Sequence, residues 1–153
     1  MEFSLQLKGF SNAVKNLQAG KSAVANATTK MLDMATLVAQ AKAKEVVPTV
    51  STTLRKSIAR KVEKDVGRVG SNVEYAPYVE FGTGIYGKRG SPIVPKRAKM
   101  LSWIGGDGKR VFARSVRGMR PRKFLQTGLE EVTNRTNQIY KVGIEALRSA
   151  IFA

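Results

Sequence analysis

The stretch Tyr75-Ala76-Pro77-Tyr78-Val79-Glu80-Phe81-Gly82-Thr83-Gly84 has a proline near its start and two glycines at its end. Proline is favoured in the first turn of a helix and glycine just after the last turn, so the stretch predicts one short helix with a forced stop. Three aromatic residues lie within it, although aromatic residues make up only 7% of the chain. We expect Tyr75, Tyr78 and Phe81 to form a buried aromatic knot that acts as a structural anchor for the segment that follows.

A strand and a long helix are predicted ahead of this turn. Apolar and polar residues alternate from Phe3 to Phe10, which is the period of a half-buried strand. A helical pattern then runs from a cap at Ser11 or Asn12 to Val47, and Pro48 ends it. About 35 residues would form a rod of roughly 50 Å, which either packs as a core helix or projects one end toward a neighbouring subunit. Its heptad-like stripe alternates larger and smaller residues: Leu17, Gly20, Val24, Ala27, Met31, Met34, Val38 and Ala41.

Two strands are predicted between this helix and the aromatic turn, over residues 57–65 and 66–73. Gly67 and Gly70 would weaken the second strand, and they indicate a bulge or a close approach of another segment to the backbone.

The chain after the aromatic turn predicts a loop, a hairpin and a final helix. Residues 84–99 contain three glycines and two prolines with almost no apolar periodicity, which indicates a long, mobile loop. Residues 100–104 and 109–113 flank Gly105-Gly106-Asp107-Gly108 and predict a β-hairpin. One amphipathic helix is expected from Phe124 onward, with an apolar stripe of Leu125, Leu129, Val132, Ile139 and Leu147.

These elements predict the α+β class in a single domain over residues 1–153. We expect an antiparallel sheet on which the long N-terminal helix and the C-terminal helix pack, together with the long basic loop and the hairpin. Trp103 and Phe112 should pack across the hairpin. Trp103 and Phe124 are expected to be further structural anchors.

The charge of the chain is strongly positive and unevenly placed. Lys and Arg number 27 against 11 Asp and Glu, a net charge of +16. Residues 84–123 contain twelve bases and a single acid, Asp107, so most of the excess lies there. Such a segment docks on acidic proteins or displaces counterions from the phosphates of nucleic acid, and charge alone leaves both possibilities open. The bases expected at a subunit or partner interface are Lys88, Arg89, Lys96, Arg97, Arg114, Arg117 and Arg120.

The side-chain inventory argues against catalysis and metal binding. The chain has no His and no Cys, so it lacks the usual general base, the usual zinc ligand and any disulfide. We therefore expect no enzyme activity, no cofactor and no metal. Glu80 is expected either to accept backbone amides or pair with an arginine, or to form a salt bridge to the next subunit of a ring. No signal peptide and no apolar run of about 20 residues is visible, so no membrane contact is expected.

Five segments occur in an order that is typical of one protein family. They are Lys8–Leu17, Pro48–Ile58 with its ending Leu54-Arg55-Lys56-Ser57-Ile58, Tyr75–Thr83, Lys99–Arg117 and Arg120–Leu125. In this order they resemble the neck and tail-completion proteins of long-tailed bacteriophages, also called head-tail joining or minor tail proteins. The chain departs from the family at Ser51-Thr52-Thr53, where a Thr-Gly pair is usual, and at Arg122-Lys123, which separates Pro121 from Phe124.

The resemblance implies a structural virion protein without catalytic activity, made in the host cytoplasm and located in the neck or tail. It implies a homo-oligomeric ring, hexameric or alternatively dodecameric, that joins the head connector or head-closure proteins to the tail terminator or tail tube. The basic excess could also contact the DNA in the channel. Two alternatives remain open: a tail terminator of similar size, and a basic DNA-binding module that contacts the genome.

Overall fold

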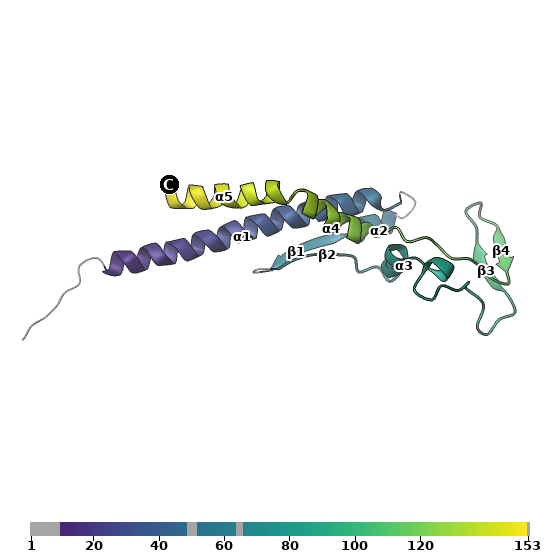
Figure 1. Cartoon of the computed structure of the whole chain (residues 1–153). Coiled ribbons are helices and arrows are strands. Elements are labelled where there is room, and N and C mark those ends of the chain that lie inside the picture. Colours follow the sequence, from purple (N-terminus) through teal and green to yellow (C-terminus); the bar gives the residue numbers. More distant parts are fainter. Residues whose placement is uncertain (1–9, 49–51, 64–65, 153) are drawn as a thin grey trace, which may run out of the picture.

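A computed structural model describes residues 10–48, 52–63 and 66–152 of the chain (Figure 1). The strand predicted over Phe3–Phe10 lies outside these residues, except for Phe10, which begins a helix. The described part confirms the α+β class. It contains the long N-terminal helix, further helices and antiparallel strands.

The helix α1 (Phe10–Val46) spans 37 residues and confirms the predicted rod. Two helices lie along it: α4 (Phe124–Asn134) and α5 (Thr136–Phe152) (Figure 1). The predicted C-terminal helix begins at Phe124 as expected, but it is divided into two helices by an interruption at Arg135. The Thr136 hydroxyl donates to the carbonyl oxygens of Thr133 at 2.7 Å and Val132 at 3.3 Å. Such side-chain bonds compete with the helical backbone ladder and bend helices.

The buried face of α1 follows the predicted heptad stripe only in part, because Ala27 and Val38 are its buried members. Val24, a member of that stripe, is 56% exposed. Small residues allow close packing in its place: a Cβ on Gly128 of α4 would lie 2.6 Å from the Ala39 carbonyl oxygen, and one on Gly143 of α5 would overlap Met31. Along its length α1 therefore packs against different elements, so a single heptad repeat does not describe which of its residues are buried. Residues four apart are buried: Ala23 and Ala27, and then Ala43 and Val47.

Over the described residues, the strands form two separate two-stranded sheets where one sheet was predicted. In the first, β1 (Ala59–Glu63) pairs antiparallel with β2 (Val66–Gly70), with Ala59 opposite Gly70. This sheet packs against α1, and a Cβ on Gly67 would lie 2.5 Å from the Thr36 methyl carbon. The predicted close backbone approach is thus confirmed at Gly67, whereas a Cβ on Gly70 would meet open space. The second sheet is the predicted hairpin, β3 (Leu101–Ile104) with β4 (Arg110–Ala113).

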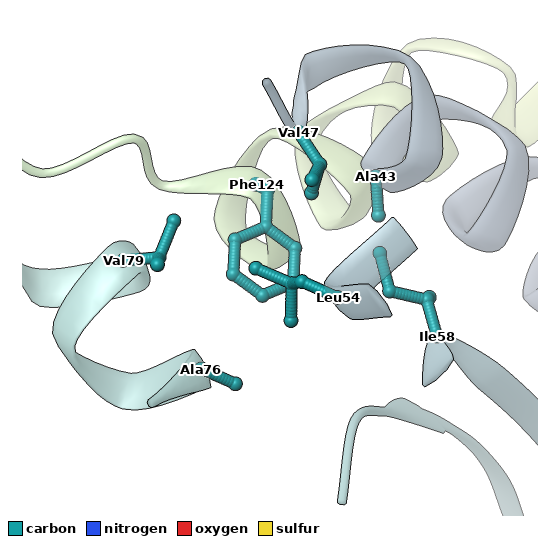
Figure 2. Close-up of a cluster of buried hydrophobic side chains, with 7 residues drawn as sticks. All are labelled: Ala43, Val47, Leu54, Ile58, Ala76, Val79 and Phe124. Carbon is teal, nitrogen blue, oxygen red and sulfur yellow. The ribbon is translucent and has the colours of Figure 1, made fainter. Parts of the chain in front are cut away.

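A small core joins the end of α1 to the helices α2 (Thr52–Ser57), α3 (Ala76–Phe81) and α4 (Figure 2). The predicted short helix is confirmed as α3, with Pro77 in its first turn and Gly82 at its C-cap, where φ is +75°. The largest fully buried side chains of this core are Leu54, Ile58 and Phe124. They bring the segments before and after residues 82–123 to one place.

Candidate interaction surface: a basic arm

Residues 82–123 leave the body of the molecule and return to it, and we call this segment the arm. It begins after α3, contains the short helix η1 (Gly84–Tyr86) and the β3–β4 hairpin, and ends where α4 begins. Figure 1 shows the hairpin set apart from α1, α4 and α5 at one end of the molecule. Most residues of the arm are exposed.

Both ends of the arm are fixed to the same core. Val79 of α3 precedes the arm and Phe124 of α4 follows it, and both side chains belong to the cluster in Figure 2. Arg122 N donates to Val79 O at 2.8 Å, and Lys123 N donates to Glu80 O at 3.2 Å. The arm therefore starts and ends at one packed point.

Glu80 caps the helix that follows the arm. The residue is 6% exposed, and its carboxylate accepts backbone N–H bonds from Leu125 at 2.9 Å and from Gln126 at 3.0 Å. The N-cap residue, Lys123, has a left-handed φ of 50° and makes no side-chain cap of its own. A carboxylate at a helix N-terminus satisfies free amides and complements the helix dipole. The predicted acceptance of backbone amides is confirmed, and both oxygens are used inside the chain. The alternative, a salt bridge from Glu80 to the next subunit of a ring, stays a prediction.

The two limbs of the arm are held together by backbone hydrogen bonds. The predicted loop at about 84–99 is thus one limb of the arm, and residues 114–119 form the other limb. The mobility of the loop stays a prediction. The bonds run from Thr83 N to Met119 O at 2.9 Å, from Ile85 N to Arg117 O at 2.8 Å, and both ways between Ile93 and Val116 at 2.8 and 2.9 Å.

Two glycines make the close crossing of the limbs possible. Gly84 and Gly118 have φ angles of +63° and +93°. A Cβ on Gly84 would overlap the carbonyl oxygen of Arg117, and a Cβ on Gly118 would overlap that of Thr83. Side chains other than glycine are strained at such angles, and the opposing atoms are backbone atoms, so both positions require glycine.

The arm carries its charge on exposed side chains. Within the described ranges, none of its twelve bases forms an ion pair, and the arm's acid, Asp107, accepts the backbone amide of Lys109 at 3.1 Å. The Arg120 guanidinium lies 5.4 Å from the centre of the Tyr86 ring. All the bases that the sequence placed at an interface are exposed on the arm: Lys88, Arg89, Lys96, Arg97, Arg114, Arg117 and Arg120.

The expected buried aromatic knot is wrong. Tyr75, Tyr78 and Phe81 are 40%, 60% and 69% exposed. They share one face of α3, and the opposite face, with Ala76 and Val79, packs beside Phe124 (Figure 2). Small side chains let the helix backbone come close to the core. The spacing of Ala76 and Val79, three residues apart, was the signal in the sequence for this choice of face.

The two hairpin aromatics, which were predicted to pack across the hairpin, each have a partner on the other strand. Trp103 lies opposite Val111, and Phe112 lies opposite Ser102, so the two rings are on different faces of the hairpin. Trp103 is 41% exposed and its cross-strand partner is the β-branched Val111, while Phe112 is 58% exposed. Phe124, in contrast, is fully buried in the core.

A groove in the body was not predicted from the sequence. It has a volume of about 450 Å³ and lies between α1, β2, α3 and α4. Phe81 and Leu129, which are 69% and 66% exposed, contribute to its lining. The feature of the sequence that could have indicated this groove is the apolar stripe of the last helix, which includes Leu129. The further apolar residues that line it are Leu32, Ala35, Ala39, Val69, Leu125 and Val132.

A metal site and a membrane-spanning helix are the two other features that the described residues could contain. Among these residues, no cluster of three or more acidic side chains could hold a metal ion. Of the helices described, none combines the length and the apolar character required to cross a membrane.

Residues 10–82 match the family model described as "Bacteriophage HK97-gp10, putative tail-component". The match covers a little under half of the chain, runs from α1 to α3, and ends where the arm begins. A search of curated proteins and a search of solved structures each gave no match. The family supports a structural role in the phage tail or neck and a location in the virion, together with other tail or head proteins. The resemblance to phage neck and tail proteins is thereby confirmed over residues 10–82, which match the model of the HK97-gp10-like family of phage tail components.

Proposed function

We propose that the protein is the subunit of a ring in the phage neck, where it joins the head connector to the tail and completes the tail without any catalytic step. The observation that carries this proposal is the arm: a projecting, exposed segment with a net charge of +11, fixed at both ends to a packed core. The family match to tail components supports the same role. The whole chain acts as one unit, with a body that forms the ring and an arm that reaches a neighbour.

The arm docks on acidic surfaces of head-closure, tail-terminator or tail-tube proteins. Exposed charges at the rim of an interface raise the rate of association and exclude wrong partners more than they raise affinity. Contacts between unlike surfaces of identical subunits close into a ring when the rotation between neighbours closes. We expect a hexamer, with a dodecamer as the alternative.

Charge reversal on the arm separates this function from DNA binding. The test variant carries Arg114→Glu and Arg117→Glu, and the matched control carries Lys21→Glu and Lys30→Glu, which reverse two exposed bases of α1. A phage that lacks the protein is supplied with each variant, and infectious particles and duplex-DNA affinity are measured. The proposal predicts that the arm variant fails to support assembly while the control succeeds.

Two results would decide against the proposal. Complete, infectious virions formed without the protein would exclude a neck subunit. Intact assembly by the arm variant, together with loss of a DNA affinity that falls steeply between about 50 and 200 mM salt in the wild type, would identify a DNA-binding module.

A further inference from the structure

The groove between β2 and α4 has a mainly apolar lining, to which Thr36, Glu80 and Gln126 add polar groups, and two strongly exposed apolar side chains. On α1 it is lined by Leu32, Ala35 and Ala39, and on the opposite sides Phe81 and Leu129 are more than half exposed. Apolar groups left in water this way favour a partner that covers them.

The strand that borders the groove is paired on one side. In the described ranges, β2 pairs with β1, and no third strand joins their sheet. A two-stranded sheet is marginal by itself, and an unpaired edge accepts a further strand. Gly67 and Val69 of β2 line the groove. A strand added beside β2 would therefore place every second side chain over α1, between β2 and α4.

The occupant must be an extended segment with apolar residues at every second position. Residues 3–7 have this pattern, with Phe3, Leu5 and Leu7 on one side and Ser4 and Gln6 on the other. We propose that residues 3–7 of a neighbouring copy of the chain bind in the groove as a third strand beside β2. This inference rests on the proposed ring, for which it supplies a contact between subunits.

The length of the chain excludes the same copy as the donor. Leu32 is the groove residue of α1 closest in sequence to Phe10, and 22 residues of helix separate the two, about 33 Å at 1.5 Å per residue. Phe3 is seven residues from Phe10, and seven extended residues span at most about 25 Å. Leu5 and Leu7 are closer to Phe10 in sequence, so they can lie only at shorter distances from it. The segment stops short of its own groove, so it reaches the groove of another copy.

The absence of cysteine from the chain allows a direct test. Full-length Leu5→Cys and Leu129→Cys variants are mixed and oxidised, and the disulfide is located by peptide mass spectrometry. The proposal predicts a link between positions 5 and 129. The matched control replaces Leu129→Cys with Ile144→Cys, whose wild-type side chain is 62% exposed but lies on α5 outside the groove. No link between positions 5 and 144 is expected.

A second set of variants measures the effect on assembly. Leu5→Asp combined with Leu7→Asp, and separately Leu129→Asp, should lose the oligomer mass measured for the wild type, while Ile144→Asp keeps it. In the proposed contact, residues 3–7 bind to another copy and do not stabilise their own. The Leu5→Asp, Leu7→Asp variant should therefore have the same melting temperature by circular dichroism as a dilute wild-type sample. Equal linking at positions 129 and 144, or an intact oligomer in the first variant, would overturn the strand contact. Either result would leave the neck function standing, because infectious-particle assembly through the arm is measured separately.

Discussion

Glu80 shows how one side chain connects the start of the arm with its end. It leaves α3 immediately before the arm and accepts two amides of α4 immediately after it. A carboxylate buried among backbone donors has no substitute nearby, since Lys123 at the N-cap provides no side-chain bond. Sequence reasoning anticipated backbone amides as partners but could not identify which ones, because they lie 45 and 46 residues away.

Replacing Glu80 should therefore destabilise the fold. Glu80→Ala leaves two partly buried amides without their acceptor and removes a helix cap, which should cost about 1–3 kcal/mol of unfolding free energy. Glu130→Ala changes an exposed residue of α4, the helix that Glu80 caps, and should change the unfolding free energy by no more than about 0.5 kcal/mol. Urea denaturation followed by circular dichroism measures both. Equal costs for the two variants would show that Glu80 does not cap α4.

Gly118 provides a second test at the scale of one residue. Gly118→Ala should separate the limbs of the arm, because its Cβ meets the Thr83 carbonyl at a positive φ. Hydrogen exchange at the Thr83 and Ile85 amides should become faster, since these amides bond the opposite limb. Gly106→Ala in the hairpin turn is the control, because a Cβ there has open space. Unchanged exchange in Gly118→Ala would contradict the proposed crossing of the limbs.

At the scale of elements, local signals in the sequence were sufficient for several predictions. The long helix up to Val46, the proline-started turn at Ala76–Phe81 and the glycine-rich hairpin were all predicted from neighbouring residues. Burial was harder to predict because it depends on contacts between distant segments. The buried face of α3 is set by Phe124, and the burial of α1 is set by glycines of β2, α4 and α5. The break at Arg135 coincides with two hydrogen bonds of the Thr136 hydroxyl, which the helical period does not reveal.

The orientation of α3 gives a test at this scale. Val79→Ala removes buried methyl groups from the core and should cost about 1–3 kcal/mol of unfolding free energy. Tyr78→Ala removes a larger but 60% exposed side chain and should change that free energy by no more than about 0.5 kcal/mol. Thermal or urea unfolding compares the two variants. A larger cost for Tyr78→Ala would restore the aromatic knot as the anchor.

At the scale of the whole molecule, a packed body and a charged arm have different tasks. The body holds the ends of the arm together, and the arm presents unpaired bases away from it. Charges in water are screened by salt over about 8–10 Å at 0.1–0.15 M ionic strength. Association of the purified protein with phage particles that lack it should therefore slow as salt increases. The Arg114→Glu, Arg117→Glu variant should lose most of that dependence, whereas a salt response equal to that of the wild type would exclude the arm as the docking surface.

We propose a ring of this subunit between head and tail, in which each arm contacts a head or tail protein. A reconstruction of the intact neck tests it most directly, because it locates each subunit and each arm at once. The account predicts a closed ring of this subunit between the head connector and the tail, with residues 84–123 of every copy against an acidic surface. A neck without this subunit, or a ring whose arms point into solvent, would contradict it.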